Sequence, residues 1–200
     1  MLGCFKYDGP YTLASGRTAK YYYDGKLATQ DPPTAWLAGK AIVDVVLESG
    51  AEAVGGPEIG SIFISDAVGL AAHLERGVRL PTFVVRKQPK GHGTQSQISA
   101  AMTDDGEPLI RPGRKVAIVE DVITTGGSIQ KAVDVLREIG AEVVLVVALV
   151  ERHESGERAL RGQGFEVLRL FYTDEEGRLY IDEAYVRRAE AAAERAAVGR

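Results

Sequence analysis

Short apolar runs rich in branched residues alternate along the chain with longer stretches in which apolar residues recur every three or four positions. The runs predict buried strands at Ala51 to Gly56, Thr82 to Val85, Val116 to Val119, Val143 to Val150 and Val167 to Phe171. The longer stretches predict helices at Thr34 to Glu48, Gly60 to Glu75, Ser128 to Ile139 and Glu183 to Ala197. This alternation is typical of a mostly parallel sheet covered by helices on both faces, so the predicted class is α/β.

The clearest helix is the one that begins at Ser128. One buried face is predicted for it, because the helical spacing holds for Ile129, Ala132, Val133 and Leu136, and Gly140 then ends it. The last helix is alanine-rich, with interspersed Arg and Glu, and we expect it to lie on the surface and fray at its end, over about residues 183–197.

Two segments fit no regular element. Residues 10–26, PYTLASGRTAKYYYDGK, mix glycine, hydroxyls and three consecutive tyrosines, and we expect a small N-terminal hood over about residues 1–30. Residues 86–95, RKQPKGHGTQ, are basic and interrupted by proline and glycine, which predicts a loop. No internal repeat or low-complexity linker divides the sequence, so residues 1–200 are expected to form a single domain.

Composition narrows the partners. With 24 Lys and Arg against 28 Asp and Glu the net charge is −4, which excludes a global basic field for nucleic acid or an anionic membrane. The longest apolar run, Val143 to Val150, is far shorter than the ~20 residues that cross a bilayer, and no signal-peptide pattern begins the chain. We therefore expect a soluble, cytoplasmic protein. The single cysteine, Cys4, excludes an internal disulfide and a multi-cysteine metal site.

A phosphate site is predicted at residues 120–128, EDVITTGGS, which join a predicted strand to a predicted helix. In open α/β sheets ligands bind at the carboxyl ends of strands. Free backbone N–H groups and the helix dipole attract an anion there, and Gly126 and Gly127 let the backbone approach it closely. The segment lacks the lysine of a nucleoside-triphosphate loop, and the chain has no G-x-G-x-x-G motif for a dinucleotide.

Glu120 and Asp121 directly precede this phosphate loop and would repel its anion unless they contact something else. Sugar hydroxyls, a divalent cation or positive charge developing during a reaction would each suit them, and a phosphorylated sugar offers all three. The alternative is that the acids cap the next turn and the glycines merely reverse the chain. That interpretation does not explain why two threonines, two glycines and a serine follow one another in TTGGS.

This strand, acid pair and Thr/Gly/Ser loop resemble the phosphoribosyl pyrophosphate (PRPP) signature of type I phosphoribosyltransferases. Three further segments narrow the resemblance to orotate phosphoribosyltransferases: YTLASGRTAKYYYD is similar to that family's N-terminal segment, FVVRKQPKGHGT to its mobile catalytic loop, and LVERHESG to its base-binding segment. The motifs stand in the family's order and cover about residues 5–173. The resemblance implies a type I phosphoribosyltransferase fold, a central mostly parallel sheet flanked by helices and topped by a small hood.

The resemblance also implies roles for individual residues. PRPP would be bound by Arg86, Lys87, Lys90, His92, Glu120, Asp121, Val122, Ile123, Thr124, Thr125, Gly126, Gly127 and Ser128. Orotate would be bound by Thr124, Arg152, Tyr22 and Tyr23, and the catalytic residues would be Lys90, His92 and Asp121. Mg²⁺ would be the cofactor, carried mainly by PRPP with no direct protein ligand. The family further implies a homodimer in which loop 86–95 is shared between the subunits.

Elementary chemistry is consistent with these roles. Departure of pyrophosphate leaves positive charge on the ribose ring and negative charge on the leaving group, which suits electrostatic catalysis without a protein nucleophile. Arg152 offers a planar fork to a carboxylate, which orotate has and uracil, adenine and hypoxanthine lack. On its own a basic run such as 86–95 would be a solvated charge cluster or a weak nucleic-acid patch, but the neighbouring phosphate motif favours a pyrophosphate contact. HESGE, at 153–157, lacks the second histidine of a zinc motif.

The sequence departs from the family pattern at two positions. Many members have lysines where this chain has Ala14 and Gly60, and Arg17 and Lys20 are candidates to replace them. Two other functions stay open: a phosphoribosyltransferase for another base, and a regulator that senses PRPP without catalysis.

Overall fold

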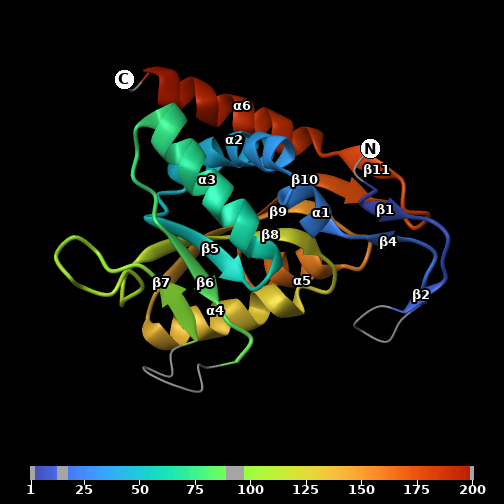
Figure 1. Ribbon diagram of the computed structural model, residues 1–200, viewed down its shortest axis with the longest axis horizontal. Coiled ribbons are helices and arrows are strands. Elements are labelled where there is room, and N and C mark those ends of the chain that lie inside the picture. The colour runs from blue at the N-terminus through green and yellow to red at the C-terminus, as the bar shows by residue number, and fades with distance from the viewer. Residues whose placement is uncertain (1–2, 13–17, 89–96, 199–200) are drawn as a thin grey trace.

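The computed structural model describes residues 3–12, 18–88 and 97–198. Within these ranges, seven strands form one sheet in the order β11-β10-β9-β8-β5-β6-β7 (Figure 1). The strands are β5 (Ala53–Pro57), β6 (Thr82–Val85), β7 (Ile98–Ala100), β8 (Lys115–Ile123), β9 (Glu142–Glu151), β10 (Val167–Thr173) and β11 (Leu179–Ile181). The central strands β10, β9, β8, β5 and β6 run parallel, and β7 and β11 close the two edges as antiparallel strands.

Helices cover both faces of the sheet, as the alternating sequence pattern predicts. On one face lie α2 (Pro32–Glu48), α3 (Gly60–Arg76) and α6 (Glu183–Val198), and on the other lie α4 (Gly127–Ile139) and α5 (Gly156–Gly162) (Figure 1). Successive side chains of β8 pack on opposite faces of the sheet. Ala117 and Val119 pack in the core under α2 and α3, whereas Val116 and Ile118 pack in the core under α4. The two faces are thus both buried, which explains why β8 reads as a continuous apolar run.

Two helices differ from their predicted form. α2 begins two residues before the predicted start, because the Asp31 carboxylate accepts a hydrogen bond from Thr34 N at 3.2 Å and two prolines occupy the first helical positions. α6 lies on the surface as expected, but it is anchored: Tyr185 is buried, and its hydroxyl donates to the Ala41 carbonyl of α2 at 2.8 Å.

The hood is built from two small antiparallel pairs. β1 (Phe5–Lys6) pairs with β4 (Tyr22–Tyr23), and β2 (Tyr11–Thr12) pairs with β3 (Thr18–Ala19). The short helix α1 (Gly25–Thr29) follows. Tyr21 is buried, and its hydroxyl lies 2.7 Å from Thr173 Oγ1 at the end of β10, so the hood is fastened to the carboxyl edge of the sheet.

The sheet has its topological switch point between β5 and β8. The chain leaves β5 through α3 on one face and leaves β8 through α4 on the opposite face, and in open α/β sheets such a point is where ligands bind. Among the described residues, no helix is long and apolar enough to span a bilayer.

β8 is longer than the predicted strand, which ended at Val119. Its pairing with β9 continues to the partners Ile123 and Glu151. Glu120 and Asp121 therefore belong to the strand, and the loop proper begins at Thr124. This corrects the expectation that the acids lie in the loop after the strand, and the cause is the unbroken pairing with β9.

Candidate active site

A cleft of about 610 Å³ opens at the carboxyl ends of β8 and β9, beneath the hood. It joins side chains from the hood, the acid pair, the loop before α4 and the end of β9. The residues that line it are Thr12, Tyr22, Tyr23, Gly25, Lys26, Asp121, Val122, Thr124, Thr125, Gly127, Ser128, Arg152 and Glu154. Three stretches of the chain that are distant in the sequence thus meet around one space.

The acid pair is buried, and its two members are placed differently. Asp121 lines the cleft, wedged between Gly25 of α1 and Gly60 of α3, neither of which has room for a Cβ atom beside its carboxylate. Glu120 lies beneath, where its Oε1 accepts a hydrogen bond from Asp121 N and its Oε2 accepts one from Ser128 Oγ, both at 3.3 Å. Burial, and then the neighbouring Asp121 charge, raise the pKa of Glu120 well above its ordinary 4.5.

The loop before α4 has the geometry of an anion cradle. Gly126 adopts the left-handed conformation with φ 78°, and no side chain of the described residues caps the helix that starts at Gly127. Thr124, Thr125 and Ser128 also line the cleft. Ile123 differs from its neighbours, because its side chain is buried in the core under α4 and only its backbone faces the loop. The first turn of α4 thus offers backbone N–H groups to the cleft.

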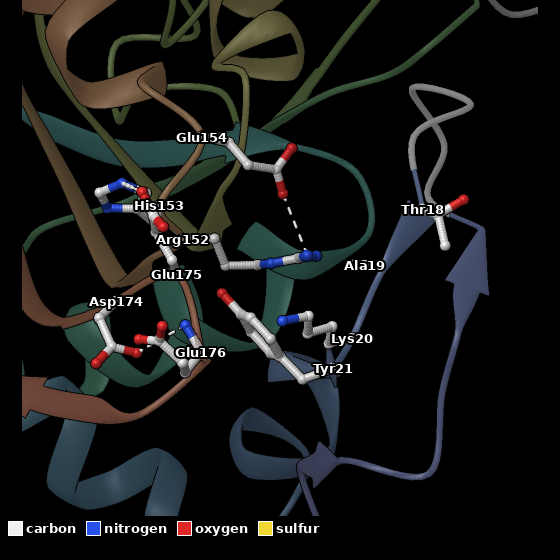
Figure 2. A pocket seen from close by; sticks show the side chains of 10 residues that line it. All are labelled: Thr18, Ala19, Lys20, Tyr21, Arg152, His153, Glu154, Asp174, Glu175 and Glu176. Carbon is white, nitrogen blue, oxygen red and sulfur yellow. Dashed lines mark hydrogen bonds and ion pairs between the residues drawn. The ribbon is translucent and has the colours of Figure 1, made fainter.

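Arg152 follows β9 and is buried at the wall of the cleft. Its backbone N donates to the Ile123 carbonyl at 2.9 Å, so the turn it begins is tied to β8. The Tyr21 ring lies 5.1 Å from the guanidinium carbon, and Glu154 Oε1 lies 3.2 Å from Nη2 (Figure 2). Tyr22 and Tyr23 line the cleft where the sequence predicts them, but the ring that packs on Arg152 is Tyr21, which was not predicted.

Residues 151–157, which we call the base turn, form ion pairs with Arg169 of the neighbouring strand β10. They also pack against the phosphate loop. Arg169 of β10 contacts Glu151 at 2.8 Å, and Glu157 and Asp182 at 2.9 Å. Gly156, at the start of α5, lies so close to the Thr124 carbonyl that a Cβ atom would overlap it. The base turn and the phosphate loop are therefore in direct contact.

Lys26 is a cleft residue that no motif identified. Its Nζ lies 2.7 Å from Asp24 Oδ1, and the hydrogen bond to Asp24 raises the pKa of the ammonium, so the side chain is cationic. The available signal was local: Asp24 is a helix cap that directly follows the tyrosine run, and Lys26 stands two positions later.

The basic loop reaches a neighbouring space. Arg86 and Lys87 line a cleft of about 510 Å³ that also includes Ser128, so this cleft adjoins the first one at the start of α4. The base of the loop is closed by a hydrogen bond from Arg86 N to the Gln97 carbonyl at 2.8 Å. Lys90 and His92 lie outside the described residues.

Of the two candidates to replace the family lysines, Lys20 is described by the structure. Lys20 lines a third cleft, of about 380 Å³, together with Tyr21, Arg152 and Glu154 (Figure 2), so it stands beside the base turn rather than the phosphate loop. Ala14 and Arg17 lie outside the described residues. Within the described part of the chain, no three His, Cys, Asp or Glu side chains are grouped so as to hold a metal ion.

Comparison with known proteins places this geometry in a family. Residues 64–163 match the phosphoribosyl transferase domain family. The chain is 40% identical over 165 residues to an orotate phosphoribosyltransferase of Aquifex aeolicus, covering 82% of this chain and 85% of the relative. A crystal structure of Mycobacterium tuberculosis orotate phosphoribosyltransferase is 30% identical, with a TM-score of 0.69 over 85% of this chain and 90% of that one. A structure of the same enzyme in complex with PRPP is 27% identical, with a TM-score of 0.62 over 80% and 85% of the two chains. The predicted α/β class and type I fold are confirmed.

Proposed function

This chain belongs to the orotate phosphoribosyltransferase family, and on that premise we propose that it transfers the 5-phosphoribosyl group from PRPP to orotate. The products are orotidine 5′-monophosphate (OMP) and pyrophosphate, in pyrimidine nucleotide synthesis. The observation that carries the proposal is a single cleft that combines a buried carboxylate, an uncapped helix N-terminus and a buried arginine.

PRPP takes the part of the cleft between β8 and α4. The 5′-phosphate accepts hydrogen bonds from the backbone N–H groups of the phosphate loop, where the helix dipole favours an anion. Asp121 accepts hydrogen bonds from the ribose hydroxyls, and Glu120 supports it from below. The complex of a relative with PRPP supports this assignment of the donor.

Orotate takes the part of the cleft between the hood and the base turn. The guanidinium of Arg152 binds the carboxylate of orotate, and Thr124 contacts the base beside the phosphate loop. Tyr22 and Tyr23 flank the planar base from the hood. A buried arginine at this place favours an anionic base over a neutral one, because a guanidinium forms stronger hydrogen bonds to a carboxylate than to a neutral group.

The reaction needs no covalent intermediate with the protein. As the bond from the anomeric carbon to pyrophosphate breaks, the ribose ring gains positive charge, which the Asp121 carboxylate stabilises. The leaving pyrophosphate gains negative charge, which Arg86, Lys87, Lys90 and His92 stabilise from the basic loop. Closure of that loop excludes water, which would otherwise hydrolyse PRPP.

Mg²⁺ is the proposed cofactor, and it is carried mainly by PRPP. The cleft suits a hard cation bound to phosphate oxygens, because the Asp121 carboxylate lines the same space and would favour a nearby positive charge without being a direct ligand. When bound, the ion would neutralise charge on the pyrophosphate. Lys26, Thr125 and Ser128 then orient the remaining phosphate oxygens from the walls of the cleft.

We also propose a homodimer with the basic loop shared between subunits. An apolar face suited to a second copy runs along α3: Ile59, Leu70 and Leu74 are 54%, 56% and 67% exposed. With the half-buried Phe63, these side chains stand four, seven and four residues apart, which places them along one side of the helix. Because Ile59 directly precedes α3 at the cleft, a partner on this face stands next to the active site.

The decisive experiment measures orotate consumption with and without PRPP and Mg²⁺. We expect consumption only when both are present, with release of pyrophosphate. Adenine and uracil serve as alternative acceptors; turnover of either one, with orotate untouched, would reject the orotate assignment. PRPP binding without turnover of any base would instead support a regulator that senses PRPP.

A further inference from the structure

Arg152, the residue proposed to bind the carboxylate of orotate, already has a carboxylate next to it. Glu154 Oε1 lies 3.2 Å from Arg152 Nη2, and the two side chains are only 10% and 5% exposed (Figure 2). The turn between them is tight, with Glu154 N donating to the Arg152 carbonyl at 2.6 Å. This turn folds the glutamate side chain back over the arginine.

The contact is an ion pair without the geometry of a hydrogen bond. Among the described residues, Glu154 Oε1 and Arg152 Nε are buried atoms that make no hydrogen bond. A buried polar atom without a hydrogen bond is unfavourable, because the water that it lost on burial is not replaced. The arrangement is therefore electrostatically paired but incompletely satisfied, and a better-placed carboxylate could replace it.

The open donor defines where such a carboxylate would bind. A guanidinium can hold a carboxylate through two parallel hydrogen bonds on either of two edges, Nε with Nη2 or Nη1 with Nη2. Glu154 lies on Nη2, the atom that both edges share, while Nε is buried and has no hydrogen-bond partner in the described part of the chain, so a carboxylate reaches that edge only when a covering side chain moves. The Tyr21 ring lies 5.1 Å from the guanidinium carbon and is itself anchored by Thr173, so the side of the arginine that the ring covers is closed to a ligand.

We propose that Glu154 is a resident counter-ion of Arg152, which the carboxylate of the base must displace in order to bind. The inference rests on the proposed function, and it adds a residue that lowers the affinity for the base. Two carboxylates close to one buried guanidinium repel each other, so a bidentate substrate carboxylate and Glu154 do not share Nη2. Glu154 keeps the arginine paired while the site is empty.

The third cleft offers space for the displaced side chain of Glu154. Arg152 and Glu154 line both the active-site cleft and the third cleft, and the third cleft also contains Lys20 (Figure 2). If the Glu154 carboxylate moves into this third cleft, it enters a space whose lining includes the positive charge of Lys20. Lys20, which lines the third cleft and not the cleft with the phosphate loop, would then pair with the displaced carboxylate.

The test compares two nucleotides that differ only in the carboxylate, OMP and uridine 5′-monophosphate (UMP), by titration calorimetry. In Glu154→Gln the resident negative charge is absent, and we expect OMP to bind about tenfold more tightly than to the wild type, because one charged contact no longer has to be broken. UMP affinity is expected to stay unchanged. The KM for orotate should fall in parallel.

Glu175→Gln is the matched control. Glu175 lines the third cleft and is 78% exposed, so its substitution removes a nearby negative charge without touching Arg152. Equal tightening in this variant would assign the effect to general charge and overturn the proposal. Unchanged or weaker OMP binding by Glu154→Gln would also overturn it, showing that Glu154 instead orients the arginine. A wild type that does not bind OMP would contradict the proposed function itself.

Discussion

Gly60, the first residue of α3, lies directly against the carboxylate of Asp121 on β8. A Cβ atom at this glycine would overlap Oδ1 of Asp121 and would lie 2.9 Å from Oε1 of Glu120. Where many members of the family have a lysine, this chain therefore has a position without space for any side chain. The acid pair and the start of α3 form one packed unit.

Gly60→Ala is accordingly expected to displace Asp121 and reduce kcat/KM by on the order of 10²-fold, the scale that follows from misplacing a reacting group by about 1 Å. Gly60→Lys should also lose activity, although it restores the residue common in the family. Steady-state kinetics with PRPP varied would measure both. Gly162→Ala, where an added Cβ meets nothing within 4 Å, is the control. A gain of activity in Gly60→Lys would refute the packing argument.

Glu120 gives the unliganded protein a predictable pH dependence. Its raised pKa means that the folded state holds this proton more tightly than the unfolded state. The stability from this group is therefore fully present below pH 4.5 and is lost as the pH rises through the raised pKa. Urea unfolding between about pH 5 and pH 8 should show a decline that Glu120→Gln reduces.

Glu52→Gln serves as the control for this measurement. The backbone N–H of Lys115 is the main cause that lowers the pKa of Glu52, so this group affects the pH dependence only below its ordinary pKa of 4.5. Its removal should leave the slope at higher pH unchanged. Identical slopes for the wild type and Glu120→Gln would show that Glu120 does not take up a proton on folding.

Arg152→Lys tests recognition of the base while keeping the positive charge beside Glu154. Lysine lacks the planar fork, so the KM for orotate should rise about 10- to 100-fold, with the KM for PRPP little changed. The neighbour His153 has an exposed side chain, and His153→Ala should behave as the wild type. A parallel rise in both KM values would mean that Arg152 acts through the packing of the cleft.

The shared loop can be tested by mixing inactive subunits. Lys90→Ala should lower turnover by on the order of 10²-fold if this residue stabilises charge in the transition state. Mixed with Asp121→Asn, it should recover about a quarter of wild-type activity, because half of the random dimers have one intact site of two. Activity that remains at the level of the separate variants would indicate that each site is complete within one chain.

Charge on α3 should dissociate the proposed dimer. The double variant Leu70→Glu, Leu74→Glu places carboxylates on the exposed apolar face, and sedimentation should show a monomer at concentrations where the wild type is a dimer. Val198→Glu, at an 88% exposed position on α6, is the control. If the wild type sediments as a monomer, the proposed dimer is wrong.

The main helices and strands could be predicted from the sequence because their buried and exposed side chains alternate with a regular period. β6 was predicted with its observed bounds, and the buried residues of α4 are the four whose spacing predicted its inner face. Both elements have a buried face that repeats over their whole length, so neighbouring residues carry enough information to identify them.

Elements without such a face could not be predicted. All three residues of β11 are exposed, so no alternation marks it as a strand. The short helix α5 has seven residues, slightly less than two turns, and only Gly156 and Leu160 among them are buried. This is too short for a helical period to show in the sequence. β7 is similarly brief, and it exists because it pairs with the edge of β6. Tertiary contacts determine these elements.

The same distinction applies to the cleft. The phosphate loop and Arg152 are found from local motifs, and both line the cleft. Tyr21 and Glu154 were missed because their significance comes from packing on Arg152. For Tyr21 that contact joins the hood to a residue far along the chain, and a local sequence pattern cannot predict such a contact.

The contact of Gly156 with the Thr124 carbonyl joins the turn that we propose for the base to the loop that we propose for the sugar phosphate. On these assignments, a base that orders the turn at Arg152 should also order the loop, and a phosphate in the loop should order the turn. Each substrate should therefore raise the affinity for the other by the same factor, since coupling free energies are reciprocal. We expect the two binding events to be cooperative through this contact between one carbonyl oxygen and one glycine.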